Sequence, residues 1–141
     1  MQIFVVGSII YTASKLDKKR FNNQITEAHI ILDCLNGKNG WGKHPLVKMY
    51  KDCKGWLELY IEVFRSFKAG NIDIANKISE EAEKVKPSWM DQKFYNRHKS
   101  RLFTKNPNYY NEWCYLGKSY SNWYMVDGVW KEYIQKIKGT D

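Results

Sequence analysis

The chain has 141 residues, a formal net charge of +8 at pH 7 and 16% aromatic residues. This length suffices for one domain with one modest hydrophobic core, so we expect a single α-helical domain over residues 1–141. No segment reaches the roughly 20 apolar residues of a membrane span, which excludes membrane-spanning classes of protein from our expectation. The positive charge favours polyanionic partners such as nucleic acids.

The cysteines and the first residues bear on the compartment. Cys34, Cys53 and Cys114 are far apart and lack C-x-x-C spacing, so we expect reduced thiols in a cytoplasmic protein. The apolar start, Ile3 to Ile10, is short and has no preceding basic residues, which argues against a signal peptide.

Apolar spacing predicts an extended arm followed by helices. Residues 1–6 read as a short strand or extended arm, and helical spacing runs from Ser14 to Leu35, with Asn36-Gly37 as its end. After a polar loop that contains three glycines, Pro45 suits the first turn of a second helix over 45–69. We expect these two helices to pack antiparallel through their apolar stripes.

The rest of the chain also reads as mainly helical. We expect helices over 72–85 and 89–104, a further helix start at Asn106-Pro107, and a final helix over about 126–137. The predicted fold is therefore mostly α, a single compact helical domain with a short extended N-terminal arm.

One face of the predicted helix 14–35 carries polar side chains. Arg20, Gln24 and Glu27 recur at i, i+4 and i+7 and so share one side of the helix. Long polar side chains are normally solvated, and that is the ordinary reading. Against it, Lys15, Lys18 and Lys19 already crowd the polar side, so the three residues are candidates for a ligand-binding pocket.

A second candidate lies around Trp41, His44 and Lys48. His44-Pro45 follows a glycine-rich turn and opens a helix, and helix N-termini attract anions. His44 is alternatively a simple helix cap, and Trp41 is either a core anchor or a stacking surface for a base. Lys48 belongs to a basic block over 38–54.

A third candidate is the acid-free basic block over 93–105. Arg97, His98 and Ser100 fall within one predicted helix and are candidate ligand contacts, although a solvated basic face is the alternative. The histidines lack metal-ligand spacing, and no phosphate-binding loop or dinucleotide fingerprint occurs. We therefore expect no metal and no cofactor, and nothing favours a Cys–His nucleophile pair.

Three ordered motifs resemble one known family. They are Leu16-Asp17-x-Lys19-Arg20-x-x-x-Gln24-x-x-Glu27-Ala28, then Gly40-Trp41-x-x-His44-Pro45-x-Val47-x-Met49-Tyr50, then Pro87-x-Trp89 with His98-x-Ser100-x-Leu102-x-x-Lys105-Asn106-Pro107-x-x-Tyr110. Together they are similar to the pyrimidine-dimer DNA glycosylases of the endonuclease V type, in the small phage and bacterial branch. The similarity spans about residues 1–110.

The resemblance implies an α-helical DNA-repair fold and a DNA N-glycosylase and lyase activity. In that family the N-terminal α-amine attacks the sugar C1′ and a glutamate on the first long helix assists; Glu27 occupies the corresponding helix. Here residue 2 is Gln2, so we expect Met1 to be retained and dimer-containing DNA to be cleaved poorly.

Two classes of function follow as expectations. The first is a DNA-binding glycosylase-like protein with Glu27 as catalytic residue and Arg20, Gln24, Trp41, His44, Lys48, Arg97, His98 and Ser100 around the ligand. The alternative is a non-catalytic phage protein that binds and sequesters a small nucleotide or a nucleotide-derived signal. Steep salt dependence of binding would favour the first class.

Overall fold

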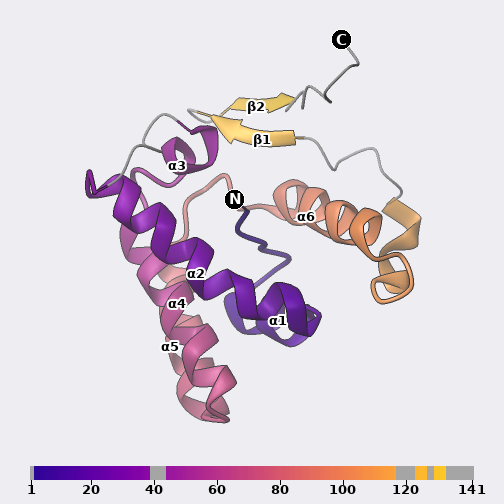
Figure 1. Cartoon of the computed structure of the whole chain (residues 1–141), viewed down its shortest axis with the longest axis horizontal. Coiled ribbons are helices and arrows are strands. Elements are labelled where there is room, and N and C mark those ends of the chain that lie inside the picture. Colours follow the sequence, from indigo (N-terminus) through magenta and orange to yellow (C-terminus); the bar gives the residue numbers. More distant parts are fainter. Residues whose placement is uncertain (1, 39–43, 117–122, 127–128, 133–141) are drawn as a thin grey trace.

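A computed structural model describes residues 2–38, 44–116, 123–126 and 129–132. Its helices are α1 (Ile9–Lys15), α2 (Lys18–Leu35), α3 (Pro45–Met49), α4 (Lys54–Lys68), α5 (Ile72–Val85) and α6 (Gln92–Lys105), followed by the 3-10 helix η1 (Asn111–Leu116). Two short strands, β1 (Trp123–Val126) and β2 (Val129–Glu132), pair antiparallel (Figure 1). The mostly helical prediction is confirmed. Within the described part of the chain, no helix is long and apolar enough to cross a membrane.

Helices α2 and α4 pack antiparallel, as the sequence predicts. Phe21 near the start of α2 stacks on Phe64 near the end of α4, with ring centroids 5.0 Å apart. At the other end, the Lys54 ammonium donates to the side-chain carbonyl of Asn36 at 3.1 Å. Helix α5 lies along the other side of α4, so α4 is largely buried between its neighbours.

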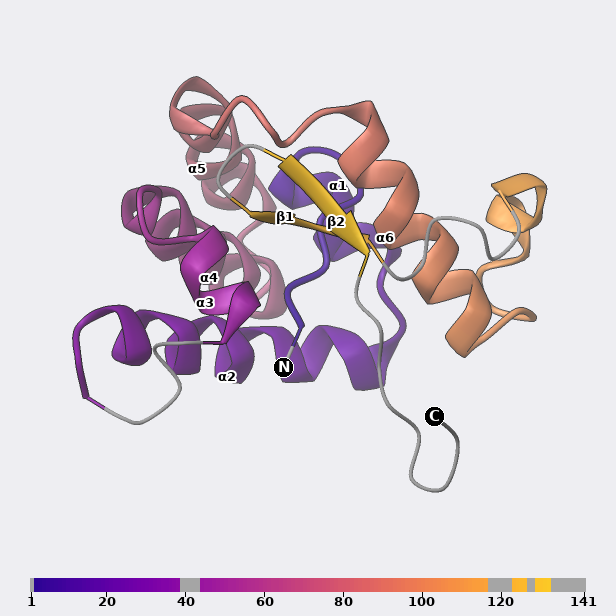
Figure 2. The same ribbon diagram turned by 90° about the horizontal axis from the view of Figure 1, so that it is seen from above.

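The N-terminal arm runs through the middle of the molecule rather than over its surface. Figures 1 and 2 both show it between α2 and α6. Ile3, Phe4, Val5 and Val6 are all buried, each at most 4% exposed. The predicted extended arm is thus a core segment, and the polar groups of its backbone must find partners inside the protein.

The predicted helix 14–35 is two helices with a break at Leu16-Asp17. Leu16 is extended, with φ −69° and ψ 139°, and its side chain is buried. Asp17 is the N-cap residue of α2, but its carboxylate accepts no hydrogen bond from a backbone N–H of the first turn. That carboxylate is instead bound to Arg20 and to Tyr110, a tertiary contact that the local pattern does not contain.

The predicted helix 45–69 is also broken, between Tyr50 and Cys53. The Tyr50 and Trp56 rings stack, with centroids 6.1 Å apart and planes 18° apart. In a straight helix, side chains six positions apart point about 120° away from each other, so this contact requires a turn. Both rings are buried, which explains why an uninterrupted apolar pattern continues across the break.

The later elements confirm some boundaries and correct others. The predicted helix 72–85 matches α5, and α6 begins at Gln92 because the Asp91 carboxylate accepts from the Phe94 N–H at 3.0 Å. The predicted helix start at Asn106-Pro107 is wrong, because Asn106 ends α6 and the next helix, η1, begins at Asn111. The Asn106 side chain instead accepts from the Tyr109 N–H across the turn between them. The prediction of a final helix over 126–137 is wrong at Val129–Glu132, which is strand β2. Residues 133–137 lie outside the described residues.

Candidate functional site

Gln24 binds the backbone of the N-terminal arm. Its Oε1 accepts from the Phe4 N–H at 2.8 Å, and its Nε2 donates to the Gln2 carbonyl at 3.3 Å. The Tyr60 hydroxyl from α4 lies 2.8 Å from both the Phe4 carbonyl oxygen and Gln24 Oε1. Gln24 is 2% exposed, so these bonds form away from water, where losing a partner is costly.

His98 anchors the next residue of the arm from α6. Its Nδ1 accepts from the Val5 N–H at 2.8 Å, which requires an imidazole that is unprotonated at Nδ1. Burial, together with the nearby positive charge of Arg101, lowers the pKa of His98 to about 3. His98 is therefore neutral near pH 7 and is suited to holding backbone rather than to binding an anion through charge.

Thr12 completes the set of anchors. Its hydroxyl oxygen accepts from the Val6 N–H at 3.1 Å, so the amides of three successive residues, Phe4 to Val6, each have a side-chain partner. These partners come from α2, α6 and α1. The path of residues 2–6 is consequently specified by three separate helices.

The contacts of Gln24 define which way the polar face of α2 points. Arg20 precedes Gln24 by one turn and Glu27 follows it by nearly one turn, so all three lie on the face that meets the arm. Glu27 is half-buried, about 4.5 Å further along the helix axis than Gln24. Glu27 is thus on the same face of α2 as the amide that binds the Gln2 carbonyl.

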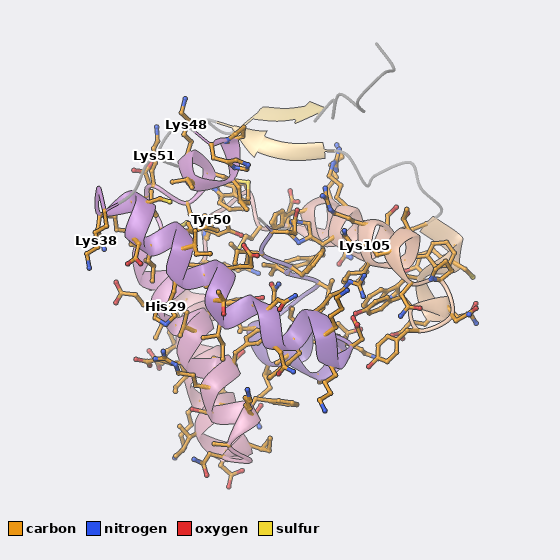
Figure 3. All side chains as sticks on the ribbon, in the orientation of Figure 1. His29, Lys38, Lys48, Tyr50, Lys51 and Lys105 are labelled. Carbon is orange, nitrogen blue, oxygen red and sulfur yellow. The ribbon has the colours of Figure 1, made fainter. Side chains whose placement is uncertain are left out.

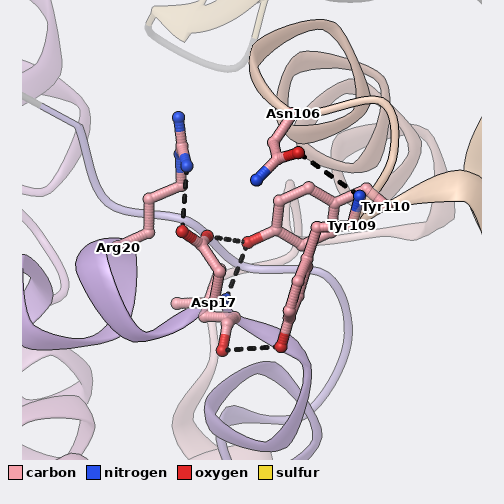
Figure 4. A network of polar contacts seen from close by, with 6 residues as sticks. Asp17, Arg20, Asn106, Tyr109 and Tyr110 are labelled. Carbon is pink, nitrogen blue, oxygen red and sulfur yellow. Dashed lines mark hydrogen bonds and ion pairs between the residues drawn. The ribbon is translucent and has the colours of Figure 1, made fainter.

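Arg20 is held by a network that joins the start of α2 to the turn between α6 and η1 (Figure 4). Its guanidinium donates to Asp17 Oδ2 at 3.0 Å, and the Tyr110 hydroxyl donates to Asp17 Oδ1. The Asp17 N–H in turn donates to the Tyr110 hydroxyl at 2.9 Å. Burial and the bond to Asp17 raise the pKa of Tyr110, so its hydroxyl remains a donor.

Basic side chains surround this network. The pKa of Lys105 is lowered by burial and then by the positive charges of Arg101, Arg20 and Lys19. These four cations come from the first turn of α2 and the second half of α6. The sequence-predicted basic block 93–105 is therefore combined in space with the beginning of α2.

A second group of cations lies around α3. Figure 3 shows Lys38, Lys48 and Lys51 at the end of the molecule formed by α3 and the last turn of α2, away from Lys105 on α6. Lys48 is exposed. His44 caps α3 by accepting from the Leu46 N–H at 3.1 Å, which confirms its reading as a helix cap. Burial lowers the pKa of His44, and the positive charge of the N-terminal amine adds to this effect.

Of the remaining predicted site residues, Arg97 and Ser100 lie in the interior of the protein. Both are buried on α6, and the Arg97 guanidinium donates to the Lys93 carbonyl at 3.3 Å. Trp41 lies outside the described residues. Burial raises the pKa of Cys53 to about 12, so this thiol stays protonated. No three His, Cys, Asp or Glu side chains within the described ranges gather as a metal site would require.

Residues 1–65 match the model of the pyrimidine dimer DNA glycosylase family. The match confirms the resemblance seen in the sequence over this segment, which contains the arm, α2 and most of α4. Comparison with curated proteins and with solved structures gives no match.

Several residues of this arrangement were not among the candidates from the sequence. Tyr60, Thr12, Asp17 and Tyr110 carry the bonds that hold the arm and Arg20. Asp17 lies in the segment that matches the family model, and Tyr110 lies in the third motif of the sequence resemblance, so those motifs were an available signal. Tyr60 lies in an apolar stripe and resembles an ordinary core residue there.

Proposed function

We propose that this protein binds DNA as a pyrimidine-dimer-glycosylase-like protein, with Glu27 and the N-terminal amine at its reaction centre. The observation that carries the proposal is the hydrogen-bonded anchoring of residues 4–6 by Gln24, His98 and Thr12. Any buried backbone needs hydrogen-bond partners, but here the partners are side chains from three separate helices, so the path of the arm is fixed relative to all three. Such fixing suits an arm that positions a reactive group within a narrow range of geometry.

The position of Glu27 supports the same proposal. Glu27 shares the α2 face of Gln24, whose amide donates to the Gln2 carbonyl, one residue from the amine. A carboxylate at this place can accept a proton from an attacking amine or stabilise the positive charge of an imine. Attack of the amine nitrogen on C1′ of the sugar displaces the base, and the nitrogen then loses a proton. Cleavage of the C1′–O4′ bond, with a proton delivered to O4′, opens the sugar ring and gives the carbon–nitrogen double bond.

The charge distribution supports DNA as the polyanion. Lys19, Arg20, Arg101 and Lys105 gather at one end of α6, and Lys38, Lys48 and Lys51 lie near α3 (Figure 3). Two cationic areas on one small protein suit an extended polyanion better than a small one, since each neutralised phosphate adds to affinity through counterion release.

Borohydride trapping tests the proposed reaction. The protein is incubated with borohydride and duplex DNA that contains a cyclobutane pyrimidine dimer, and in a separate reaction with duplex DNA that contains an abasic site. The intact mass of the protein is then measured by mass spectrometry. Reduction of the imine would give a covalent protein–DNA adduct at the N-terminus, and the same spectrum reports whether Met1 is present. We expect Glu27→Gln to lower adduct formation at least tenfold while the far-UV circular dichroism stays unchanged.

The matched control is Glu62→Gln, which makes the same chemical change at an exposed position of α4. It should trap DNA like the unaltered chain. Equal trapping by Glu27→Gln and the unaltered chain would remove Glu27 from the reaction. Absence of any adduct, together with saturable binding of a free nucleotide, would favour the nucleotide-sequestering alternative.

A further inference from the structure

We propose that the first turn of α2 and the C-terminal half of α6 form a binding site for a DNA backbone phosphate, in which Tyr110 and Asp17 hold Arg20 in place. The proposal rests on the proposed DNA binding and adds a site and two positioning residues to it. Tyr110 lies outside the segment that matches the family model.

Arg20 is oriented before any ligand arrives. The ion pair of Arg20 Nη1 with Asp17 Oδ2 uses one edge of the guanidinium, and its side chain is 19% exposed (Figure 4). A planar guanidinium has five N–H donors, so the remaining donors suit a phosphate's oxygens. Because its rotamer is already restricted, less conformational entropy is lost on binding.

Tyr110 keeps Asp17 in the position in which its carboxylate binds Arg20. Its hydroxyl donates to Asp17 Oδ1 and accepts from the Asp17 N–H, so both the carboxylate and the backbone of Asp17 are fixed. The Tyr110 ring stacks on Trp113, with centroids 5.4 Å apart and planes 7° apart. Tyr110 is 1% exposed, so the anchor itself is shielded from water.

Four cations gather around the network. Lys19, Arg20, Arg101 and Lys105 lie closely enough together that the first three lower the pKa of Lys105, after the larger effect of burial. Asp17 binds Arg20 within this group. Mutual repulsion of this kind is relieved by an anion, and a phosphodiester supplies one negative charge with two acceptor oxygens.

The test measures binding of a fluorescent duplex with an abasic-site analogue, by anisotropy, from 50 to 200 mM NaCl. Lys105→Gln should reduce the slope of log K against log[NaCl] by about 1, as expected for one lost phosphate contact. Tyr110→Phe preserves the charges and the ring, so it should keep the slope and weaken binding about three- to tenfold. Arg20→Lys should behave like Tyr110→Phe, because it keeps the charge but loses the planar donors.

Two controls distinguish this site from the general effect of losing any surface cation or any tyrosine hydroxyl. Lys77→Gln removes one exposed cation from α5, which lies away from α6 in Figures 1 and 2, and should leave the slope unchanged. Tyr109→Phe removes a hydroxyl from the neighbouring ring, which is 54% exposed. This hydroxyl donates to the Leu16 carbonyl at 3.5 Å and not to the Asp17 carboxylate, so its removal should leave affinity unchanged. If Tyr110 positions Asp17, then Tyr110→Phe should weaken DNA binding and Tyr109→Phe should not. A general change of the surface would affect binding by the two variants alike.

The outcomes distinguish this proposal from the proposed function. If the unaltered chain binds the duplex and Lys105→Gln, Tyr110→Phe and Arg20→Lys all bind like it, the phosphate site is overturned and DNA binding stands. If Tyr110→Phe is unfolded by circular dichroism, Arg20→Lys decides the matter. Displacement of the duplex by millimolar dTMP would overturn the assignment to a DNA backbone, and failure of the unaltered chain to bind any duplex would overturn both proposals.

Discussion

A single buried imidazole connects α6 to the N-terminal arm. His98 accepts from the Val5 N–H and lies against the rings of Phe4 and Phe94, with centroids 6.0 and 4.3 Å away. Protonation of Nδ1 would remove the acceptor and place a charge in a largely apolar environment near Arg101. The neutral form of this residue is therefore part of the folded structure.

His98 should make the protein sensitive to acid. Its pKa is about 3 in the folded chain and 6.5 in the reference state, so between these values the unfolded chain binds more protons. The stabilisation is complete above about pH 6.5 and falls as pH drops towards 3, by at most about 1.4 kcal/mol per pH unit from this residue. Urea denaturation at a series of pH values measures it.

The His98→Gln variant isolates this contribution. Glutamine does not titrate, so the dependence of unfolding free energy on pH should become shallower between pH 6 and 4. The variant should also lose about 1–3 kcal/mol at pH 7 if its amide fails to reach the Val5 N–H. An unaltered slope in His98→Gln would contradict the assignment of the acid sensitivity to His98.

At the scale of elements, helix ends depend on backbone conformations that only some residues adopt. Gly70 follows the end of α4 with φ +82°, in the left-handed region, and its N–H donates to the Phe67 carbonyl at 3.1 Å. Gly55, by contrast, lies inside the first turn of α4. A Cβ at either position would meet nothing within 4 Å, so only the backbone distinguishes them.

Alanine at these two glycines should change stability in opposite directions. Gly70→Ala should lower the unfolding free energy by about 1 kcal/mol, because a left-handed conformation strains an L-residue. Gly55→Ala should raise it by about 0.5–1 kcal/mol, because alanine favours a helix over glycine. Urea denaturation of the pair gives the comparison, and a stabilised Gly70→Ala would contradict the left-handed end of α4.

At the scale of the whole molecule, the buried arm is what joins α6 to the α2–α4 pair. Gln24 and Tyr60 bind it from one side and His98 from the other. The prediction of one domain over residues 1–141 therefore has a specific consequence. Loss of the arm's packing should weaken all of these helices together.

We expect one cooperative unfolding transition, with the same midpoint by far-UV circular dichroism and by tryptophan fluorescence. Ile3→Ala, at a fully buried position of the arm, should lower stability by about 2–5 kcal/mol and shift both signals together. Ile74→Ala, at a position of α5 that is 51% exposed, should change stability by less than about 0.5 kcal/mol. Two separated midpoints would instead indicate two independently folding parts.

Local patterns in the sequence identified most helices and several helix ends. Apolar spacing predicted α2, α4 and α5, and Pro45 and Asn36-Gly37 marked a helix start and a helix end near their observed places. The hairpin was missed although Asp127-Gly128, a dipeptide typical of two-residue hairpin turns, separates its strands in the sequence. The breaks at Leu16-Asp17 and Tyr50–Cys53 were missed because helical spacing continues across them.

The sequence by itself determined the fold class, the polar face of α2, the basic blocks and the resemblance that residues 1–65 confirm. Only the tertiary structure decided what the polar side chains touch. Gln24 and His98 have the residue types of a ligand pocket, but their partners are backbone groups 20 and 93 residues away. Hydrogen bonds are short-ranged and directional, so a side chain's partner depends on how distant segments pack, and this information is absent from any local pattern.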